Sequence, residues 1–373
     1  MIVPASFPRP IADPFSAGVP AGTSRSCHDC LARKEQGEAA GPSAEARQPP
    51  APPIHSCRMI GPDLGSAHCV NIGPGILCRV SADNDTGCVR MAIPIEDILD
   101  LERYPLHQPA GRAYSELVTS RQSDWRGGGA CALPGLIRRR MARRAVEELR
   151  QPMDSVSFRH RQAHNIYFTD DLDDLPRDLG ERRLSTTHRT LTCDQLAGTI
   201  IRAVYEWDPL RAFIQRVLEL PQLYPMVDPM ACLNVMAYGE GDELGWHFDR
   251  AEFAVTILLQ AADQGGQFEY RRGLRTAADP NHAGVRGLLA GEDDNIRQAH
   301  PAPGDLTVFS GFGSAHRVAP VRGDKPRIMA VLSYMTEPGY EYGPADRMRF
   351  YGRTSPDDAP ARSGSTRIAT SLR

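Results

Sequence analysis

From residue 231 onward, apolar and polar residues alternate with the two-residue period of β-strands. The runs are short, rich in β-branched and aromatic residues, and separated by turn signals such as Gly265-Gly266 and Pro303-Gly304-Asp305. Successive strands without intervening helices favour a sandwich or jelly roll over a parallel α/β sheet. The predicted strands are Leu233–Tyr238, Glu252–Gln260, Gln267–Tyr270, Asp305–Ser310 and Arg327–Tyr334.

Upstream, the segment Leu136–Arg150 has the period of an amphipathic helix. Its polar face carries five arginines, which could bind nucleic acid, but a solvated helix face is the favoured interpretation. The predicted apolar face is Leu136, Ile137, Met141, Ala145, Val146 and Leu149, and the arginines are Arg138, Arg139, Arg140, Arg143 and Arg144.

Further elements are predicted between this helix and the strands. The segment Ser157–Thr169 alternates and ends in an aromatic run, which indicates a strand. Thr192 and Gln195 match a capping box, so a helix is expected over Leu196–Tyr205. Asp208-Pro209 indicates the start of another helix, because proline suits the first helical position. We expect these helices to support the sheet that follows.

Residues 1–90 are rich in Pro, Gly, Ala and Ser and almost lack aromatic residues, so we expect a disordered, low-complexity extension. Apolar residues begin to recur at Met91, where we place the start of the folded domain. We hypothesise that Met91 is also the translation start, which an N-terminal mass measurement on protein from its native source would test. The tail, residues 353–373, is rich in Ser, Thr and Arg and is also expected to be disordered.

The folded part is expected to comprise a helical support region with an early strand (residues 91–230) and a catalytic β core (residues 231–345). Residues 271–303 interrupt the core with a polar insertion that contains a helix-like piece at Ala283–Ala290. An insertion of this length is more often a lid or a binding loop than filler.

The net charge of −3 and the pI near 6.4 give no electrostatic case for a nucleic-acid or anionic-membrane partner. No apolar run has the length of a membrane span, and the first residues lack the pattern of a signal peptide. We therefore expect a cytoplasmic protein; the sequence is silent on its oligomeric state.

Six of the nine cysteines precede residue 90, so we expect any disulfide or zinc site to be confined to that segment. Cys27-His28-Asp29-Cys30 is a CxxC motif that other residues could complete into a zinc site. The spacings match no zinc finger, which favours free thiols. The possible partners are His55, Cys57, His68 and Cys69.

The main candidate site begins with His247 and Asp249, which are two positions apart and therefore point to the same side of an extended chain. His316 follows directly after a predicted strand. Two histidines and one carboxylate on a β scaffold are the ligand set of non-haem Fe(II) oxygenases, which leaves three coordination positions open. Each residue alone is more often structural, but the ordered set on strands predicts a metal site.

Arg327 opens the last predicted strand, where its guanidinium could bind the far carboxylate of a dicarboxylic co-substrate. Tyr238 could add a hydroxyl to the same carboxylate. Asn234 shares a strand face with Tyr238 and is a weaker candidate for the same pocket.

The segment from His247 to Tyr334 resembles the 2-oxoglutarate/Fe(II)-dependent dioxygenase superfamily, whose pattern is HxD, a distal His and an Arg shortly after it. GWHFDRAEFAVTILLQ, GGQFEY, HRVAPVRGDKPRI and HNIYF resemble a bacterial subfamily of free-amino-acid halogenases and related hydroxylases. The resemblance implies an α+β protein, mainly β with supporting helices, built around a double-stranded β-helix (jelly roll, cupin-like). It also implies Fe(II) held by His247, Asp249 and His316, 2-oxoglutarate held by Arg327, and O₂ as the oxidant.

The halogenases of this subfamily have a small residue in place of the carboxylate ligand, which frees a position for halide. This sequence has Asp249 there, so the resemblance implies hydroxylation of a small molecule, plausibly a free amino acid. Two alternatives remain open: a nucleic-acid or protein demethylase of the same fold, and a non-catalytic β-sandwich binding module. The candidate substrate residues are Arg271, Arg272, Arg275, Glu252, His164 and Asn165.

Overall fold

The computed structural model describes residues 69–71, 76–79, 88–90, 93–173 and 175–358. The chain divides into two compact units. One boundary between the units lies after Arg90, where the sequence pattern also changes. In the smaller unit, three short strands form an antiparallel sheet in the order β1-β2-β3. They are β1 (Cys69–Asn71), β2 (Ile76–Arg79) and β3 (Cys88–Arg90). The rest of the predicted extension, including the CxxC motif, lies outside the described residues.

The larger unit is organised around a curled antiparallel sheet whose two halves face each other. One half has the order β8-β17-β10-β14-β4 and the other the order β9-β15-β12-β13. The first half consists of β8 (Leu233–Tyr238), β17 (Arg327–Leu332), β10 (Ala254–Gln260), β14 (Leu306–Phe309) and β4 (Ala130–Leu133). The second consists of β9 (Leu244–His247), β15 (Ala315–Val318), β12 (Phe268–Arg271) and β13 (Arg297–Ala299).

Strand β6 (Leu184–Leu191) joins the two halves because it pairs with both β8 and β9. Strand β5 (Phe158–His164) pairs with β6 along its whole length. Strands that alternate between two facing sheets in this order form a double-stranded β-helix. The predicted fold class, mainly β with supporting helices, is therefore confirmed.

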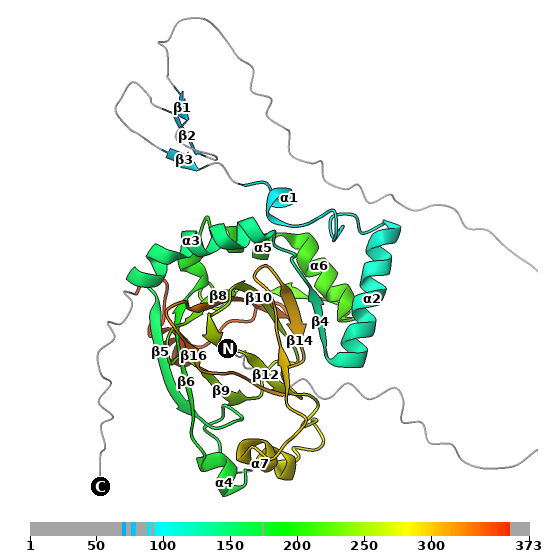
Figure 1. Cartoon of the computed structure of the whole chain (residues 1–373), viewed down its shortest axis with the longest axis vertical. Coiled ribbons are helices and arrows are strands. Elements are labelled where there is room, and N and C mark those ends of the chain that lie inside the picture. Colours follow the sequence, from blue (N-terminus) through cyan, green and yellow to red (C-terminus); the bar gives the residue numbers. More distant parts are fainter. Residues whose placement is uncertain (1–68, 72–75, 80–87, 91–92, 174, 359–373) are drawn as a thin grey trace, which may run out of the picture. The chain divides into compact units, whose positions relative to one another are not determined.

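Side-chain alternation separates two cores. On β8, Val235 and Ala237 face the helices. Met236 and Tyr238 face the space between the two half-sheets, which is called the barrel interior below. The helices cover the outer face of the first half-sheet, as Figure 1 shows, and bury most of the apolar side chains there. They are α2 (Arg112–Gly128), α3 (Arg139–Ser155), α5 (Ile200–Glu206) and α6 (Asp208–Val217).

The predicted helices exist, and α6 begins at Asp208 as predicted, but α3 and α5 begin later than predicted. Helix α3 begins at Arg139, because Ile137 before it pairs with Leu99 in an isolated antiparallel bridge. The capping box of Thr192 and Gln195 is present, but it opens a single 3₁₀ turn, η1 (Cys193–Leu196), and α5 starts later with Thr199 as its cap. Three arginines at α3 form ion pairs with Asp100, Asp97 and Glu148, as expected of a solvated helix face; they are Arg138, Arg140 and Arg144.

The polar insertion contains α7 (His282–Ala290) and β13, which lengthens the second half-sheet. Short elements complete the larger unit. They are α1 (Ile95–Ile98), α4 (Arg177–Glu181), α8 (Pro344–Tyr351), β7 (Tyr224–Pro225), β11 (Gln264–Gly265), β16 (Val321–Arg322) and β18 (Tyr334–Met335).

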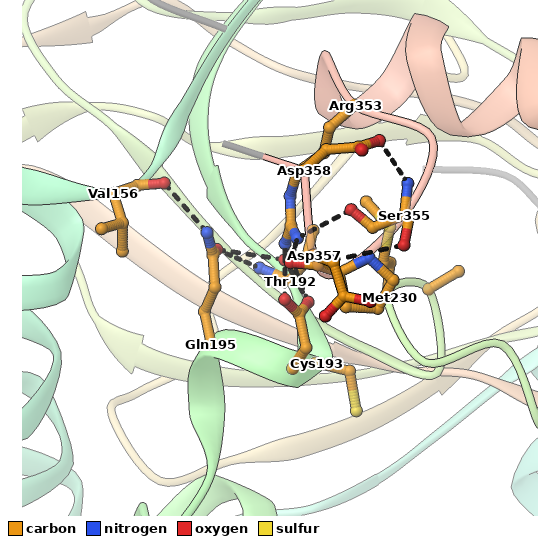
Figure 2. Close-up of polar contacts among 12 residues, drawn as sticks. Val156, Thr192, Cys193, Gln195, Met230, Arg353, Ser355, Asp357 and Asp358 are labelled. Carbon is orange, nitrogen blue, oxygen red and sulfur yellow. Dashed lines mark hydrogen bonds and ion pairs between the residues drawn. The ribbon is translucent and has the colours of Figure 1, made fainter. Parts of the chain in front are cut away.

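The segment after α8 is held against the turn that follows β6. Arg353 is buried and donates hydrogen bonds to Asp194 and to the hydroxyl of Thr192 (Figure 2). The carboxylate of Asp358 accepts hydrogen bonds from the backbone amides of Thr354 and Ser355. Residues 353–358, predicted as the start of a disordered tail, therefore form a fixed turn. The remainder of that predicted tail lies outside the described residues.

A disulfide joins Cys193 to Cys232, with 6.0 Å between the Cα atoms. The prediction that any disulfide would fall before residue 90 is therefore wrong. The two cysteines are distant in sequence, but Leu191 of β6 pairs with Val235 of β8, and this pairing brings the two strand ends together. Cysteine spacing alone does not reveal such a pairing.

Candidate metal centre

Three side chains predicted to bind metal converge at one end of the second half-sheet. His247 is the last residue of β9, and it lies directly opposite His316 of β15 in the strand register. Asp249 follows two residues later, and its Oδ1 lies 3.6 Å from Nε2 of His247 and 3.5 Å from Nε2 of His316. All three are buried. They are the only group of this kind among the residues that the structure describes.

The position of His316 differs from the prediction in one detail. It was expected directly after a strand, but a turn separates it from β14 and it lies within β15. Being within a strand fixes its ring more firmly, because strand pairing to both β9 and β12 holds its backbone.

Both imidazoles are oriented by the backbone. Nδ1 of His247 lies 2.9 Å from the carbonyl oxygen of Gly245, and Nδ1 of His316 lies 2.9 Å from that of Ser314. A carbonyl only accepts, so each Nδ1 donates to it, and Nε2 is left as the ring atom that a metal ion would bind. In metal-binding histidines, a hydrogen bond of this kind from the other ring nitrogen fixes the tautomer and the ring orientation.

The residues fit a divalent metal ion. Nε2 of His247 and Oδ2 of Asp249 are buried and have no hydrogen-bond partner, which is costly for a protein unless a ligand satisfies them. Burial, aided by His316, lowers the pKa of His247 well below its ordinary value, so the ring is neutral as a ligand must be. Burial alone would raise the pKa of Asp249, but the adjacent His316 lowers it overall, so the carboxylate is ionised.

A glycine makes room for the carboxylate. The Cβ atom of any other residue at position 311 would lie 1.8 Å from Oδ2 of Asp249. The backbone carbonyl of Gly311 also accepts a hydrogen bond from the amide of Asp249. The turn before β15 is therefore shaped around this carboxylate.

The predicted anchor residues Arg327 and Tyr238 lie opposite each other on β17 and β8. Both are buried in the barrel interior, among apolar side chains such as Leu244 and Val318. Nε and Nη1 of Arg327 have no partner, and burial lowers the pKa of its guanidinium. Burial also raises the pKa of Tyr238, so its phenol stays protonated and can donate. A buried cation without a counter-ion fits a carboxylate ligand.

Asn234 is placed differently. Its amide nitrogen donates to the carbonyls of Met230 and Leu233, and its oxygen accepts from the hydroxyl of Tyr351. Both ends of the amide are used within the protein, so Asn234 connects β8 to α8.

Most of the candidate substrate residues also have structural partners. Arg271 pairs with Asp293, Arg272 and Glu252 are exposed, and His164 is bonded at both ring nitrogens. Asn165 caps the turn that follows β5.

Arg275 lies beside the metal ligands but outside the barrel. Its guanidinium stacks between Phe248 and Phe312, 4.1 and 4.5 Å from the ring centres, and bonds the backbone oxygen of Asp249 at 3.4 Å. Burial lowers the pKa of Arg275 to about 10, so it stays charged. We infer that it holds the Asp249 segment in place.

Sequence reasoning missed Phe168, whose ring lies 5.2 Å from that of His247 and 3.8 Å from that of His164. It also missed the interior histidines His160 and His188, which face each other across β5 and β6. His160 and His164 lie four positions apart, and so on one face of the strand, which was the available signal for the histidines.

No described helix is long and apolar enough to cross a membrane. Among solved structures, the chain is similar to an oxidoreductase of the 2OG-Fe(II) oxygenase family from Burkholderia pseudomallei (16% identity, 60% of this chain and 92% of that chain, TM-score 0.36). It is also similar to a prolyl-4-hydroxylase from Pseudomonas putida (14% identity, 57% of this chain and 97% of that chain, TM-score 0.35). A third similar structure is HygX from Streptomyces hygroscopicus with nickel and 2-oxoglutarate bound (15% identity, 58% of this chain and 85% of that chain, TM-score 0.38). No curated protein matches the sequence.

The sequence matches the family described as Halogenase D over residues 117–345, which is more than half of the chain and contains all three metal-binding candidates and Arg327. The strand order and the His-Asp-His group agree with that match. The protein therefore belongs to the Halogenase D family.

Proposed function

We propose that the protein is an Fe(II)- and 2-oxoglutarate-dependent oxygenase that hydroxylates a C–H bond of a small molecule, with a free amino acid as the first candidate. The observation that carries the proposal is Asp249, whose carboxylate stands in the metal group together with His247 and His316. A halogenase needs that position for halide, and here Gly311 leaves room for the carboxylate instead.

The chain's own residues have distinct tasks in this reaction. His247, Asp249 and His316 would hold the metal and leave its remaining coordination positions to the co-substrate. Arg327 and Tyr238 bind the far carboxylate of 2-oxoglutarate in the barrel interior, where burial strengthens the charge interaction. When bound, Fe(II) with 2-oxoglutarate and O₂ supplies the oxidising power that removes hydrogen from carbon.

The cofactor assignment is tested first. Full-length protein, mixed with Fe(II) and 2-oxoglutarate without oxygen, should show a weak visible charge-transfer band. His247→Ala should remove the band, and Arg327→Ala should shift its 2-oxoglutarate dependence to much higher concentration. A wild-type protein without any band would instead indicate the non-catalytic binding module.

The reaction type is tested next. With O₂ and chloride present, the free amino acids are screened for succinate formation, and products are identified by mass spectrometry. We expect the product to gain one oxygen atom, and Asp249→Gly to lose hydroxylation. Chlorinated product from the wild-type enzyme would overturn the hydroxylase proposal, and succinate at background for every amino acid would overturn the substrate proposal.

A further inference from the structure

The carboxylate of the metal centre lies outside the strands that hold the two histidines. Strand β9 ends at His247, and residues 248–250, called the aspartate segment below, are not part of a strand. Strand pairing therefore does not fix the direction of the Asp249 side chain, although a metal ligand needs a fixed direction. Other contacts must hold the aspartate segment in place.

Two hydrogen bonds join the aspartate segment to the turn that follows β5. This turn comprises residues 165–169 and is called the β5 turn below. The backbone amide of Phe248 donates to the carbonyl oxygen of Ile166 at 2.9 Å. Nη2 of Arg250 donates to the carbonyl oxygen of Phe168 at 2.6 Å. The two donors precede and follow Asp249 directly in the chain, so the β5 turn holds the backbone on both sides of this ligand.

The β5 turn also contacts the first histidine ligand. The ring centre of Phe168 lies 5.2 Å from that of His247, with 81° between the ring planes. The ring of His316 lies 4.0 Å from that of His247, so His247 has two ring neighbours. Phe168 stacks at 3.8 Å on His164, whose ring is bonded at both nitrogens. Phe168 therefore lies between a fixed imidazole and a metal ligand, where it restricts rotation of the His247 ring.

The backbone of the β5 turn is strained and held by its own hydrogen bonds. Phe168 has a φ of 51°, a left-handed conformation that is uncommon for a bulky residue. Oδ1 of Asn165 accepts the amides of Tyr167 and Thr169, and its Nδ2 donates to the carbonyl oxygen of Thr169. Asn165 and Phe168 are both buried. A strained residue persists only where its surroundings hold it, and such residues cluster at functional sites.

We propose that the β5 turn positions the metal ligands, with Phe168 as the positioning residue for His247 and Arg250 as the one for Asp249. The inference rests on the proposed function and adds to it two residues that act on the metal through its ligands. Groups that orient metal ligands typically contribute tenfold to a hundredfold to metal affinity, roughly. Loss of either contact should therefore weaken metal binding and change the geometry around the metal.

Cobalt(II) reports on the site without turnover, because its visible d–d absorption depends on the geometry of its ligands. Full-length, metal-free protein is titrated with Co(II) alone, and the affinity and the spectrum at saturation are recorded. His247→Ala should abolish the spectrum, which assigns the signal to the metal centre. Circular dichroism and thermal unfolding show whether each variant is folded.

Two variants remove the two contacts separately. Phe168→Leu and Arg250→Met should each lower the affinity for Co(II) by roughly tenfold or more and change the d–d spectrum at saturation. Arg250→Lys keeps a cationic donor and should recover part of both the affinity and the spectrum. Should Phe168→Leu fail to fold, the two Arg250 variants still decide the proposal.

Two control variants match these changes without touching the aspartate segment. Phe350→Leu matches Phe168→Leu, because Phe350 is equally buried (8% exposed against 7%) and its ring neighbours are His160 and two tyrosines. Arg183→Met matches Arg250→Met, because Arg183 also donates to a backbone oxygen, that of Gly180. Both controls should bind Co(II) with wild-type affinity and spectrum.

Wild-type affinity and spectrum in folded Phe168→Leu or Arg250→Met would overturn the proposal. An equal loss in Phe350→Leu would also overturn it, because general packing would then explain the effect. A wild-type protein that binds no Co(II) would overturn both this inference and the proposed function. Co(II) binding with the expected variant effects, but without hydroxylation of any substrate by the Fe(II) protein, would overturn the proposed function alone.

Discussion

At the scale of single residues, Arg327 is energetically costly to bury and is suited to bind an anionic ligand. Its guanidinium is buried in the barrel interior, and two of its nitrogens lack partners. An unpaired buried charge destabilises a fold, so the residue is retained for a ligand that neutralises it.

The first prediction follows from this cost. Arg327→Met should raise the stability of the ligand-free protein, by on the order of 1–4 kcal/mol, because an apolar side chain removes the desolvation penalty. The same variant should show no rise in melting temperature with 2-oxoglutarate and metal, whereas wild type should show one. Thermal unfolding with and without ligand measures both effects. A variant less stable than wild type would argue that Arg327 has a structural partner.

A second prediction concerns Gly311. In Gly311→Ala, the new Cβ would have to displace the Asp249 carboxylate, so metal affinity should fall by roughly tenfold or more. Gly287→Ala in α7 is the matched control, because its Cβ would meet nothing within 4 Å. Metal titration followed by fluorescence or calorimetry compares the two. Unchanged affinity in Gly311→Ala would show that the carboxylate is not a ligand.

At the scale of elements, β5 and β6 bury histidines where a hydrophobic strand face would ordinarily lie. Burial lowers the pKa of both His160 and His164 to about 4, from 6.5. Below pH 6.5 the unfolded chain therefore binds more protons than the folded one, so these groups make stability fall as pH decreases.

The third prediction is the resulting pH dependence. The contribution of these histidines should be fully present above about pH 6.5 and lost progressively down to about pH 4, on the order of 3 kcal/mol for each. Urea unfolding across this range measures it. His160→Gln should flatten the dependence, while His107→Gln, at an exposed position, should not. An equal slope in all three proteins would show that the buried histidines do not control it.

The fourth prediction concerns the disulfide between β6 and β8. Cys193 and Cys232 are separated by 39 residues, so closing this loop should stabilise the oxidised protein by about 4 kcal/mol. A reductant should lower the melting temperature of wild type and leave the double variant Cys193→Ser/Cys232→Ser unchanged. Alkylation of Cys193 and Cys232 in the native protein, located by mass spectrometry, would contradict the pairing.

At the scale of the whole molecule, every residue assigned to the metal, the co-substrate or the β5 turn belongs to the larger unit. The fifth prediction is that a chain starting at Met91 keeps the Fe(II)/2-oxoglutarate band and the thermal stability of the full chain. Truncation, anaerobic spectroscopy and thermal unfolding test this. A truncated chain that loses the band would show that residues 1–90 contribute to folding or to the site.

At the same scale, the sequence pattern predicted some strands of the sheet and not others. Several strands of the β core were predictable because one face of each is apolar, and β8 was predicted with its observed bounds. Strands β9 and β15 were not predicted. Strand β6 was missed, because its interior face carries Thr186, His188 and Thr190 and so shows no hydrophobic alternation. The strand that joins the two half-sheets was thus among those that the pattern did not predict.

The sequence by itself determined the metal-binding candidates and Arg327, since their residue types and order along strands require no knowledge of distant contacts. Only the tertiary structure decided that Asn234 is bonded to α8, that Gly311 makes room for Asp249, and that the β5 turn holds the aspartate segment. These relations join segments far apart in the chain, and their geometry is fixed by strand pairing and packing that no local pattern records.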